Sequence, residues 1–250
     1  MIRNAIRLSA IALALLTTTA VGAENIGILQ ATLAEANQKT AEVSTEQLRR
    51  ILADGSAMVL DTRTRAEFDA GHIPGARNLD APAAKQVAAV ERLVETNKNA
   101  ALILYCNGPF CQASRRLAEQ LAAEGFTNVR RYQLGIPIWR ALGGPTAIEA
   151  EGITRVFDVD RTAVFIDARP AGDFAKGSVP GARNAPVEDV LSGKAKVPLP
   201  EDDFNRRVIL FGHDAVQARQ LAEMLSKRPW HNVYYFPGSF DTLRTAIGGK

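Results

Sequence analysis

An internal repeat constrains the fold of this chain more than any other feature of its sequence. Residues 61–78, DTRTRAEFDAGHIPGARN, align without a gap with residues 167–184, DARPAGDFAKGSVPGARN, at an offset of 106 positions. The same offset relates Tyr105-Cys106 to Phe211-Gly212, and it shrinks to 104 farther on, where Asn128 matches Asn232. The chain is therefore a tandem duplication of a unit of about 100 residues, and the first copy has a loop that is two residues longer.

Within each copy, short apolar runs alternate with signals for helices. Residues 58–60 and 100–105 are apolar, branched and of strand length, as expected of buried parallel strands. Capping-box pairs at Ser44–Gln47 and Thr64–Glu67 mark the start of two helices. Strands that alternate with helices predict an open parallel sheet covered by helices on both faces, so the predicted fold class is α/β, in two tandem domains.

The 250 residues divide into four predicted parts. Residues 1–23 combine a basic start, a short apolar run and a small-residue site before Glu24, which predicts a secretory signal peptide; an uncleaved membrane anchor is the alternative, although the apolar run is short for a span. Residues 24–43 form an alanine-rich lead-in that is predicted to be helical between Ile28 and Asn37. A first domain over 44–144 and a second over 152–250 follow, with the boundary near Gly143-Gly144-Pro145.

Charge and export limit the classes of partner. Cleavage removes Arg3 and Arg7, so 30 basic residues become 28 against 27 acidic ones, a net charge of +1. With no basic stripe interleaved with aromatic residues, no nucleic-acid partner is expected. The signal peptide predicts a periplasmic or secreted protein, without stable membrane insertion once the signal is cleaved.

Both cysteines of the chain lie in one stretch, residues 105–116, YCNGPFCQASRR. It follows a predicted strand and opens a helix near Ala113. A strand, a tight turn and a helix start in succession concentrate backbone N–H groups around Cys106, which favours its thiolate and any anion beside it.

At this point the sequence resembles a known family. The pattern Asp-x-Arg-x-x-x-Glu-Phe, then Gly-His-Ile-Pro-Gly-Ala and a strand-borne cysteine loop, is similar to that of the rhodanese family of sulfurtransferases. The resemblance covers nearly all of the mature chain, twice. It implies a rhodanese fold in each half and a Cys106 that carries sulfur as a persulfide. It also implies supporting roles for Asp61 and His72, and for Asp167, Arg169 and Gly181 in the second half.

The second copy departs from this pattern. Gly212-His213-Asp214 stands where the first copy has its cysteine loop, so this half cannot hold a persulfide. We interpret residues 152–250 as a non-catalytic copy. A site that uses His213 and Asp214 is the functional alternative, although polar residues are common at turns.

The expected reaction follows from the cysteine loop. Cys106 attacks the outer sulfur of a small donor anion such as thiosulfate, sulfite leaves, and a thiol, cyanide or a protein acceptor then takes the sulfur. No cofactor is expected. Besides Cys106, the residues predicted to bind substrate are Asn107, Gly108, Phe110, Cys111, Gln112, Ala113, Ser114 and Arg115. A phosphatase-like oxyanion site would need Cys-x5-Arg, and Gln112 stands in the place of that arginine.

The second cysteine leaves three interpretations open. Cys111 could attack a persulfide on Cys106 and make the pair a thiol–disulfide or sulfur-relay centre. It could also form a permanent structural disulfide, or be buried as a small apolar residue. For the function of the protein as a whole, a non-catalytic rhodanese-like binding module is the remaining alternative. No metal site is expected, because His72, His213 and His231 stand at no ligand-like spacing.

Overall fold

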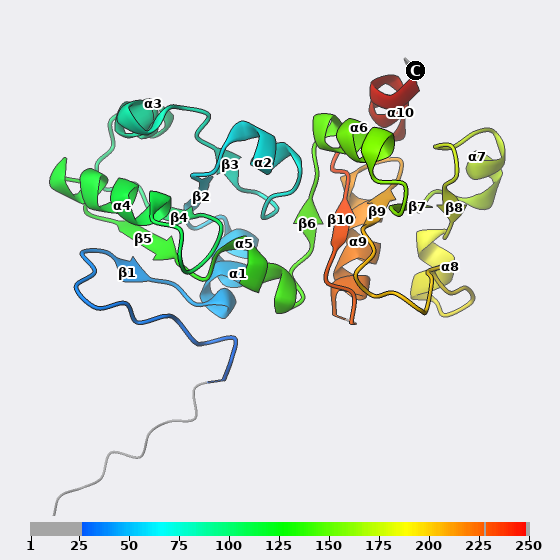
Figure 1. The fold of residues 1–250 in the computed structure, drawn as a ribbon, viewed down its shortest axis with the longest axis horizontal. Helices are drawn as coiled ribbons and strands as arrows, with labels where there is room; N and C mark the ends of the chain where they lie inside the picture. The colour runs from blue at the N-terminus through cyan, green and yellow to red at the C-terminus, as the bar shows by residue number, and fades with distance from the viewer. Residues whose placement is uncertain (1–26, 228, 249–250) are drawn as a thin grey trace, which may run out of the picture.

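The computed structural model describes residues 27–227 and 229–248. In Figure 1 these residues form two lobes that lie side by side. Each lobe contains a parallel sheet of five strands flanked by helices, which confirms the predicted α/β class in two tandem domains. The signal peptide expected over residues 1–23 lies outside the described residues.

The first domain alternates strands and helices as the sequence predicts. Its strands are β1 (Ala41–Glu42), β2 (Met58–Asp61), β3 (Arg77–Asn78), β4 (Leu102–Tyr105) and β5 (Val129–Tyr132). Its helices are α1 (Thr45–Asp54), α2 (Arg65–Asp69), α3 (Gln86–Leu93, after a short 3₁₀ turn over Ala83–Lys85), α4 (Ala113–Ala123) and α5 (Gly135–Ala141). The strand order β1-β5-β4-β2-β3 places β4 in the middle of the sheet.

The second domain repeats this arrangement. Its strands are β6 (Thr146–Ala147), β7 (Val164–Asp167), β8 (Arg183–Asn184), β9 (Val208–Phe211) and β10 (Val233–Tyr235), in the order β6-β10-β9-β7-β8. Its helices are α6 (Ala150–Val159), α7 (Ala171–Ala175), α8 (Val187–Leu191), α9 (Ala215–Ser226) and α10 (Phe240–Gly248). The central pairs even share their register, since Asp61 lies opposite Tyr105 and Asp167 lies opposite Phe211.

Helices cover both faces of each sheet because the strands are apolar on both sides. In β4, Leu102 and Leu104 pack with the residues of α3 and α4, whereas Ile103 and Tyr105 pack on the other face with α1, α2 and α5. In the second domain the corresponding two cores lie against α8 and α9 on one face and α6 and α10 on the other.

Both capping boxes predicted from the sequence are present. Ser44 accepts a hydrogen bond from the amide of Gln47, and the Gln47 side chain accepts from the Ser44 amide. Thr64 and Glu67 do the same at the start of α2. These reciprocal bonds satisfy backbone donors that a helix start would otherwise leave free.

The prediction of a helix between Ile28 and Asn37 is wrong. After a turn, residues 31–40 contain no helix, and the chain turns through positive φ at Ala34 (50°) and Asn37 (56°). The carboxylate of Glu42 accepts hydrogen bonds from the amides of residues 33–35, which a helix would have directed elsewhere. We call residues 31–40 the strap; it leads into β1, which pairs with β5.

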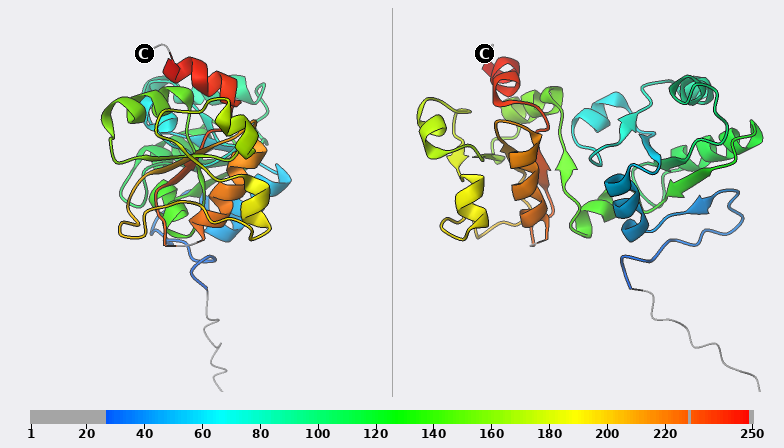
Figure 2. Two further views of the ribbon diagram at one scale, coloured as in Figure 1. Left: turned by 90° about the vertical axis from the view of Figure 1, so that its right-hand side faces the viewer. Right: turned by 180° about the vertical axis from the view of Figure 1, so that it is seen from behind.

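The two domains are joined by backbone contacts at β6. Thr146 and Ala147 belong to the second sheet, so that sheet starts ahead of the predicted domain start at residue 152. Ala147 also forms an antiparallel bridge with His72 of the first domain. The right-hand view of Figure 2 shows β6 at the junction between the lobes. In residues 27–227 and 229–248, no helix is long and apolar enough to cross a membrane.

Candidate active site

The cysteine loop lies at the carboxyl end of the central strand β4. It runs from Cys106 to Gln112, and α4 begins at Ala113, where the sequence predicted a helix to start. Cys106 is buried, with 3% of its surface exposed, whereas Phe110 at the loop tip is 96% exposed. The loop therefore holds the predicted nucleophile at its base and an aromatic ring in solvent at its tip.

Cys106 and Cys111 form a disulfide. Their Cα atoms are 6.2 Å apart, within the usual range for a disulfide. The amide of Cys111 donates to the carbonyl of Gly108 at 3.0 Å. This is one of the backbone N–H groups that the sequence predicted to gather around Cys106, and in this structure it is used within the loop.

The turn after β5 packs directly against the cysteine loop. The Ile136 amide donates to the Cys106 carbonyl at 3.2 Å. Gly135 has a φ of +65°, and a Cβ built on it would lie 2.3 Å from the Gly108 nitrogen and 2.6 Å from the Cys106 oxygen. Only a glycine leaves room for this approach of two backbones.

A second support reaches the loop from a buried arginine. Arg131 of β5 is fully buried, and its guanidinium donates to Gln133 and to Glu35 and Gln38 of the strap. The Gln133 side-chain amide donates in turn to the Pro109 carbonyl at 3.1 Å. Sequence reasoning missed this chain of contacts, because its members lie far apart in sequence and match no motif.

Asn107 connects the loop to α2. Its side-chain amide donates to the Glu67 carboxylate, which also accepts from Thr64. Burial alone would raise the pKa of Glu67, but these hydrogen bonds outweigh it and lower the pKa below its usual value. Glu67 is therefore a charged acceptor that holds Asn107 in place.

The predicted support at Asp61 lies beneath the loop. The Tyr105 hydroxyl donates to Asp61 at 2.6 Å, and Arg63 forms an ion pair with the same carboxylate. Burial and the charge of Asp61 hold the pKa of Tyr105 well above its usual value, so the phenol stays protonated. Arg63 also donates to the Gly71 carbonyl at 2.8 Å, which ties the turn before His72 to the same pair.

His72 contacts α2 and the second domain. Its ring stacks on Phe68 at 3.7 Å between centroids, and Nδ1 lies 3.0 Å from the Phe68 carbonyl oxygen. Burial lowers the pKa of His72 from 6.5 to about 4. Together with its bridge to Ala147, these contacts agree with a supporting role.

The remaining predicted residues divide into buried and exposed groups. Ser114 is buried in the first turn of α4, and Gln112 is exposed. Arg115 pairs with Glu119 and lies 3.9 Å from Glu35 of the strap, so its charge is already compensated on the helix face. The sequence predicted that Arg115 binds substrate, and this role stays a prediction.

The second domain keeps the buried aspartate–arginine pair of the first domain but has Gly212 in place of Cys106. Asp167 pairs with Arg169, and Ser178 donates to Asp167 at 2.6 Å, where the first domain uses a tyrosine from a different position. Asp214 caps α9, and His213 lies 3.0 Å from Asp173. Both polar residues are thus engaged in contacts within their own domain.

Chemically, the site offers one buried sulfur at a helix start, a second sulfur within bonding distance of it, and no charged arginine in the loop. Such an arrangement suits transfer chemistry on sulfur, with reduction of the disulfide as its entry step.

Comparison with known proteins agrees with this geometry. The family model described as a rhodanese-like domain matches the chain twice, over residues 44–142 and 156–246.

An HTH-type transcriptional regulator of Mycobacterium tuberculosis is 35% identical over 100 residues, which is 40% of this chain and 41% of that protein. A thiosulfate sulfurtransferase of Ectopseudomonas mendocina is 30% identical over 99 residues, 40% of this chain and 84% of that one. The human thiosulfate:glutathione sulfurtransferase is 36% identical over 102 residues, 36% of this chain and 84% of that protein. The chain thus spans less than half the length of the first of these relatives.

Proposed function

The chain belongs to the rhodanese-like family, and from this premise we propose that it is a sulfurtransferase that carries sulfane sulfur on Cys106. The observation that carries the proposal is the position of Cys106, buried at the end of the central strand and followed by the start of α4. Two of the similar proteins are sulfurtransferases whose names include thiosulfate, and this similarity supports the same activity class.

The proposed first step is a displacement on sulfur. The Cys106 thiolate attacks the outer sulfur of thiosulfate, a new S–S bond forms, and the bond to the sulfonate group breaks as sulfite leaves with its electron pair. The product is a persulfide on Cys106. Loop amides near the start of α4 would hold its negative charge.

The second displacement returns the enzyme to its thiolate form. An acceptor thiolate or cyanide attacks the outer sulfur of the persulfide, and the electron pair of the broken S–S bond returns to Cys106. The donor, the acceptor and a protein acceptor in place of a small thiol are all parts of this proposal. So is a periplasmic or secreted location, which is supported by the signal-like pattern of residues 1–23.

The disulfide adds a requirement to this cycle. Because Cys106 is bonded to Cys111, the protein must first accept two electrons from a thiol reductant before Cys106 can attack a donor. The oxidised protein is expected to be inactive in sulfur transfer.

The test is the intact mass of the reduced mature protein before and after thiosulfate, with the adduct mapped by peptide. We expect one added sulfur on Cys106 that cyanide discharges. Cys106→Ser should form no adduct, and the matched variant Cys111→Ser should still form it. An adduct-free protein in which both cysteines return to the disulfide would contradict sulfur transfer and leave a redox centre or a binding module.

The disulfide itself favours a second candidate function. A Cys111 thiolate could attack the Cys106 sulfur of the persulfide and expel hydrosulfide, which leaves the disulfide seen here and makes the protein a sulfane-sulfur reductase. Hydrosulfide release from the persulfidated protein, without added acceptor, should then depend on Cys111. Equal release from wild type and Cys111→Ser would argue against this function.

A further inference from the structure

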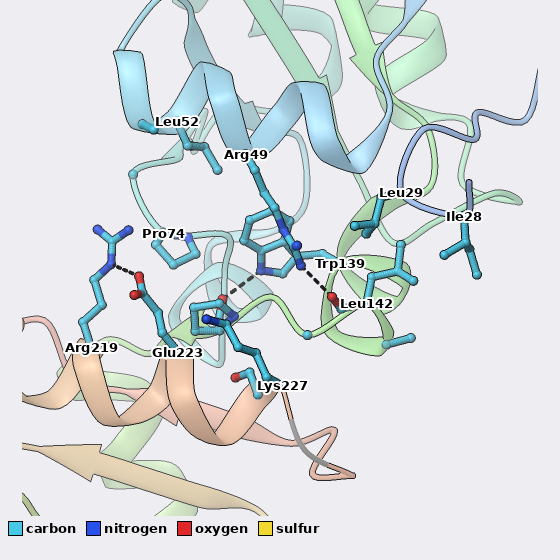
Figure 3. Close-up of a pocket in the computed structure, with 16 residues that line it drawn as sticks. Ile28, Leu29, Arg49, Leu52, Pro74, Trp139, Leu142, Arg219, Glu223 and Lys227 are labelled. Carbon is cyan, nitrogen blue, oxygen red and sulfur yellow. Dashed lines mark hydrogen bonds and ion pairs between the residues drawn. The ribbon is translucent and has the colours of Figure 1, made fainter. Parts of the chain in front are cut away.

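A cleft of about 710 Å³ lies between the two domains, and no residue of the cysteine loop lines it. Figure 3 shows its two walls: α1 with Arg49 and Leu52 on one side, and on the other α9 with Arg219 and Glu223, followed by Lys227. The volume lies within the range of protein sites that enclose a small molecule.

The wall from the first domain is largely apolar. Leu52, Pro74 and Trp139 line it, and Leu29 adds to it from the start of the described chain. The Trp139 indole is buried behind this wall, with 4% of its surface exposed; it donates a hydrogen bond to the Pro145 carbonyl at 2.8 Å, and the Arg49 guanidinium lies over the ring at 5.8 Å from its centroid. This wall is a rigid surface for an aromatic or aliphatic body.

The wall from the second domain is polar and carries unmet hydrogen-bonding capacity. The side chain of Ser226 is buried, and its Oγ has no hydrogen-bond partner among the described residues. Lys227 is exposed, its backbone amide donates to the Leu225 carbonyl, and its ammonium group forms no ion pair or hydrogen bond with the part of the chain that the structure describes. A buried hydroxyl without a partner is costly, so a bound group that satisfies it would gain affinity.

Charge selects the kind of ligand. Three cations, Arg49, Arg219 and Lys227, face the cleft against one acid, Glu223, which leaves a net charge of +2. Glu223 is already paired with Arg219 at 2.7 Å. The uncompensated charges therefore attract an anion, and the facing apolar wall requires that it carry an apolar body.

We propose that this cleft binds a small organic anion that has an apolar ring or chain and one acidic head group. The body lies against Leu52 and Leu142, and the head group lies near Lys227 and Ser226. This site is separate from the cysteine loop and does not rest on sulfur transfer at Cys106.

Two matched fluorescent probes test the proposal on the full mature chain. 8-Anilinonaphthalene-1-sulfonate has an aromatic body and an acidic group, and N-phenyl-1-naphthylamine has the same body without the charge. We expect saturable binding of the sulfonate at one site. Lys227→Glu should weaken it about tenfold and leave the neutral probe unchanged, and Ser226→Ala should weaken the sulfonate several-fold.

The controls separate this cleft from other binding. Lys85→Glu makes the same charge change at an exposed residue outside the cleft and should alter neither probe. Phe110→Ser, at the cysteine loop, should also have no effect. Ala53→Trp, which places a ring in the cleft from the exposed side of α1, should weaken both probes. Equal effects of Lys227→Glu and Lys85→Glu, loss of binding in Phe110→Ser, or no saturable binding at all would overturn the proposal.

Discussion

At the scale of single residues, the cysteine loop is shaped by side chains and glycines that are not part of it. Gly135 lets the turn after β5 approach the loop backbone, and Gln133 holds the Pro109 carbonyl. Asp61 and Tyr105 fill the space beneath. The position of Cys106 therefore depends on residues from three neighbouring strands as well as on its own sequence.

Replacing Gly135 tests this dependence. Gly135→Ala should cost at least about 2 kcal/mol more than Gly55→Ala, because both glycines have a similar φ but only the Gly135 methyl meets backbone. Gly55, at φ +61°, has nothing within 4 Å of the added carbon. Urea unfolding measures the difference, and the rate of persulfide formation should fall only in Gly135→Ala. Equal losses in the two variants would mean that the close approach does not matter.

His72 predicts a dependence of stability on pH. Its pKa is lowered from 6.5 to about 4, so below pH 6.5 the unfolded chain binds a proton that the folded protein does not. Stability is full above pH 6.5 and declines as the pH falls toward 4. We expect the free energy of unfolding to fall by about 1 kcal/mol between pH 7.5 and 5.5 from this residue.

The variant His72→Gln should remove that part of the pH dependence. Glu149, whose carboxylate lies 3.7 Å from the His72 ring, is present in both proteins. Urea unfolding at the two pH values measures the slope. An unchanged slope in the variant would show that His72 is not the group that titrates.

At the scale of elements, the strap replaces the helix that its alanine content suggested. Helix propensity acts locally and is weak, whereas Arg131 is a fully buried charge that must be compensated. Glu35 provides this compensation at 2.8 Å, and Gln38 and Thr40 accept further hydrogen bonds from the guanidinium. An extended path, interrupted by turns, brings all three strap residues to one arginine.

Removing the strap carboxylate should therefore be costly. Glu35→Ala leaves Arg131 buried without its counter-charge and should lower the free energy of unfolding by about 3 kcal/mol. Asp241→Ala, which breaks an ion pair with Arg244 that is exposed on both sides, should cost no more than about 0.5 kcal/mol. Persulfide formation should slow in Glu35→Ala alone, because Arg131 also orients Gln133. Full activity in Glu35→Ala would show that the strap does not influence the cysteine loop.

At the scale of the whole molecule, the two domains are locked together beside β6. The Glu149 amide donates to the Asp69 carbonyl at 3.0 Å, and Arg155 lies 3.5 Å from the Asp69 carboxylate. A Cβ on Gly152 of α6 would lie 2.1 Å from the same carbonyl oxygen. Backbone from both domains thus meets without space for a methyl group.

Gly152→Ala should push the domains apart. We expect it to lower the free energy of unfolding by about 2 kcal/mol and to change binding of the anionic probe in the cleft. Gly172→Ala is the matched control, since Gly172 is also helical and nothing lies within 4 Å of its added carbon. That change should be neutral or stabilising by up to about 1 kcal/mol. Thermal unfolding and small-angle scattering measure both effects, and similar behaviour of the two variants would contradict a tight interface.

The sequence by itself determined the features that depend on neighbours in the chain. The repeat predicted two similar domains, the apolar runs predicted buried parallel strands, and the capping boxes at Ser44 and Thr64 marked helix starts. The cysteine loop was also found this way, because a strand, a turn and a helix start are local patterns.

Only the tertiary structure decided the features that depend on distant contacts. The strap is extended because Arg131 lies in a strand about ninety positions away, and Gln133 reaches the loop because β5 lies beside β4. The second sheet begins at Thr146, and the cleft takes its two walls from different domains. Local patterns carry no information on which buried charge a segment must neutralise or which backbones will meet, since those are set only when the whole chain is packed.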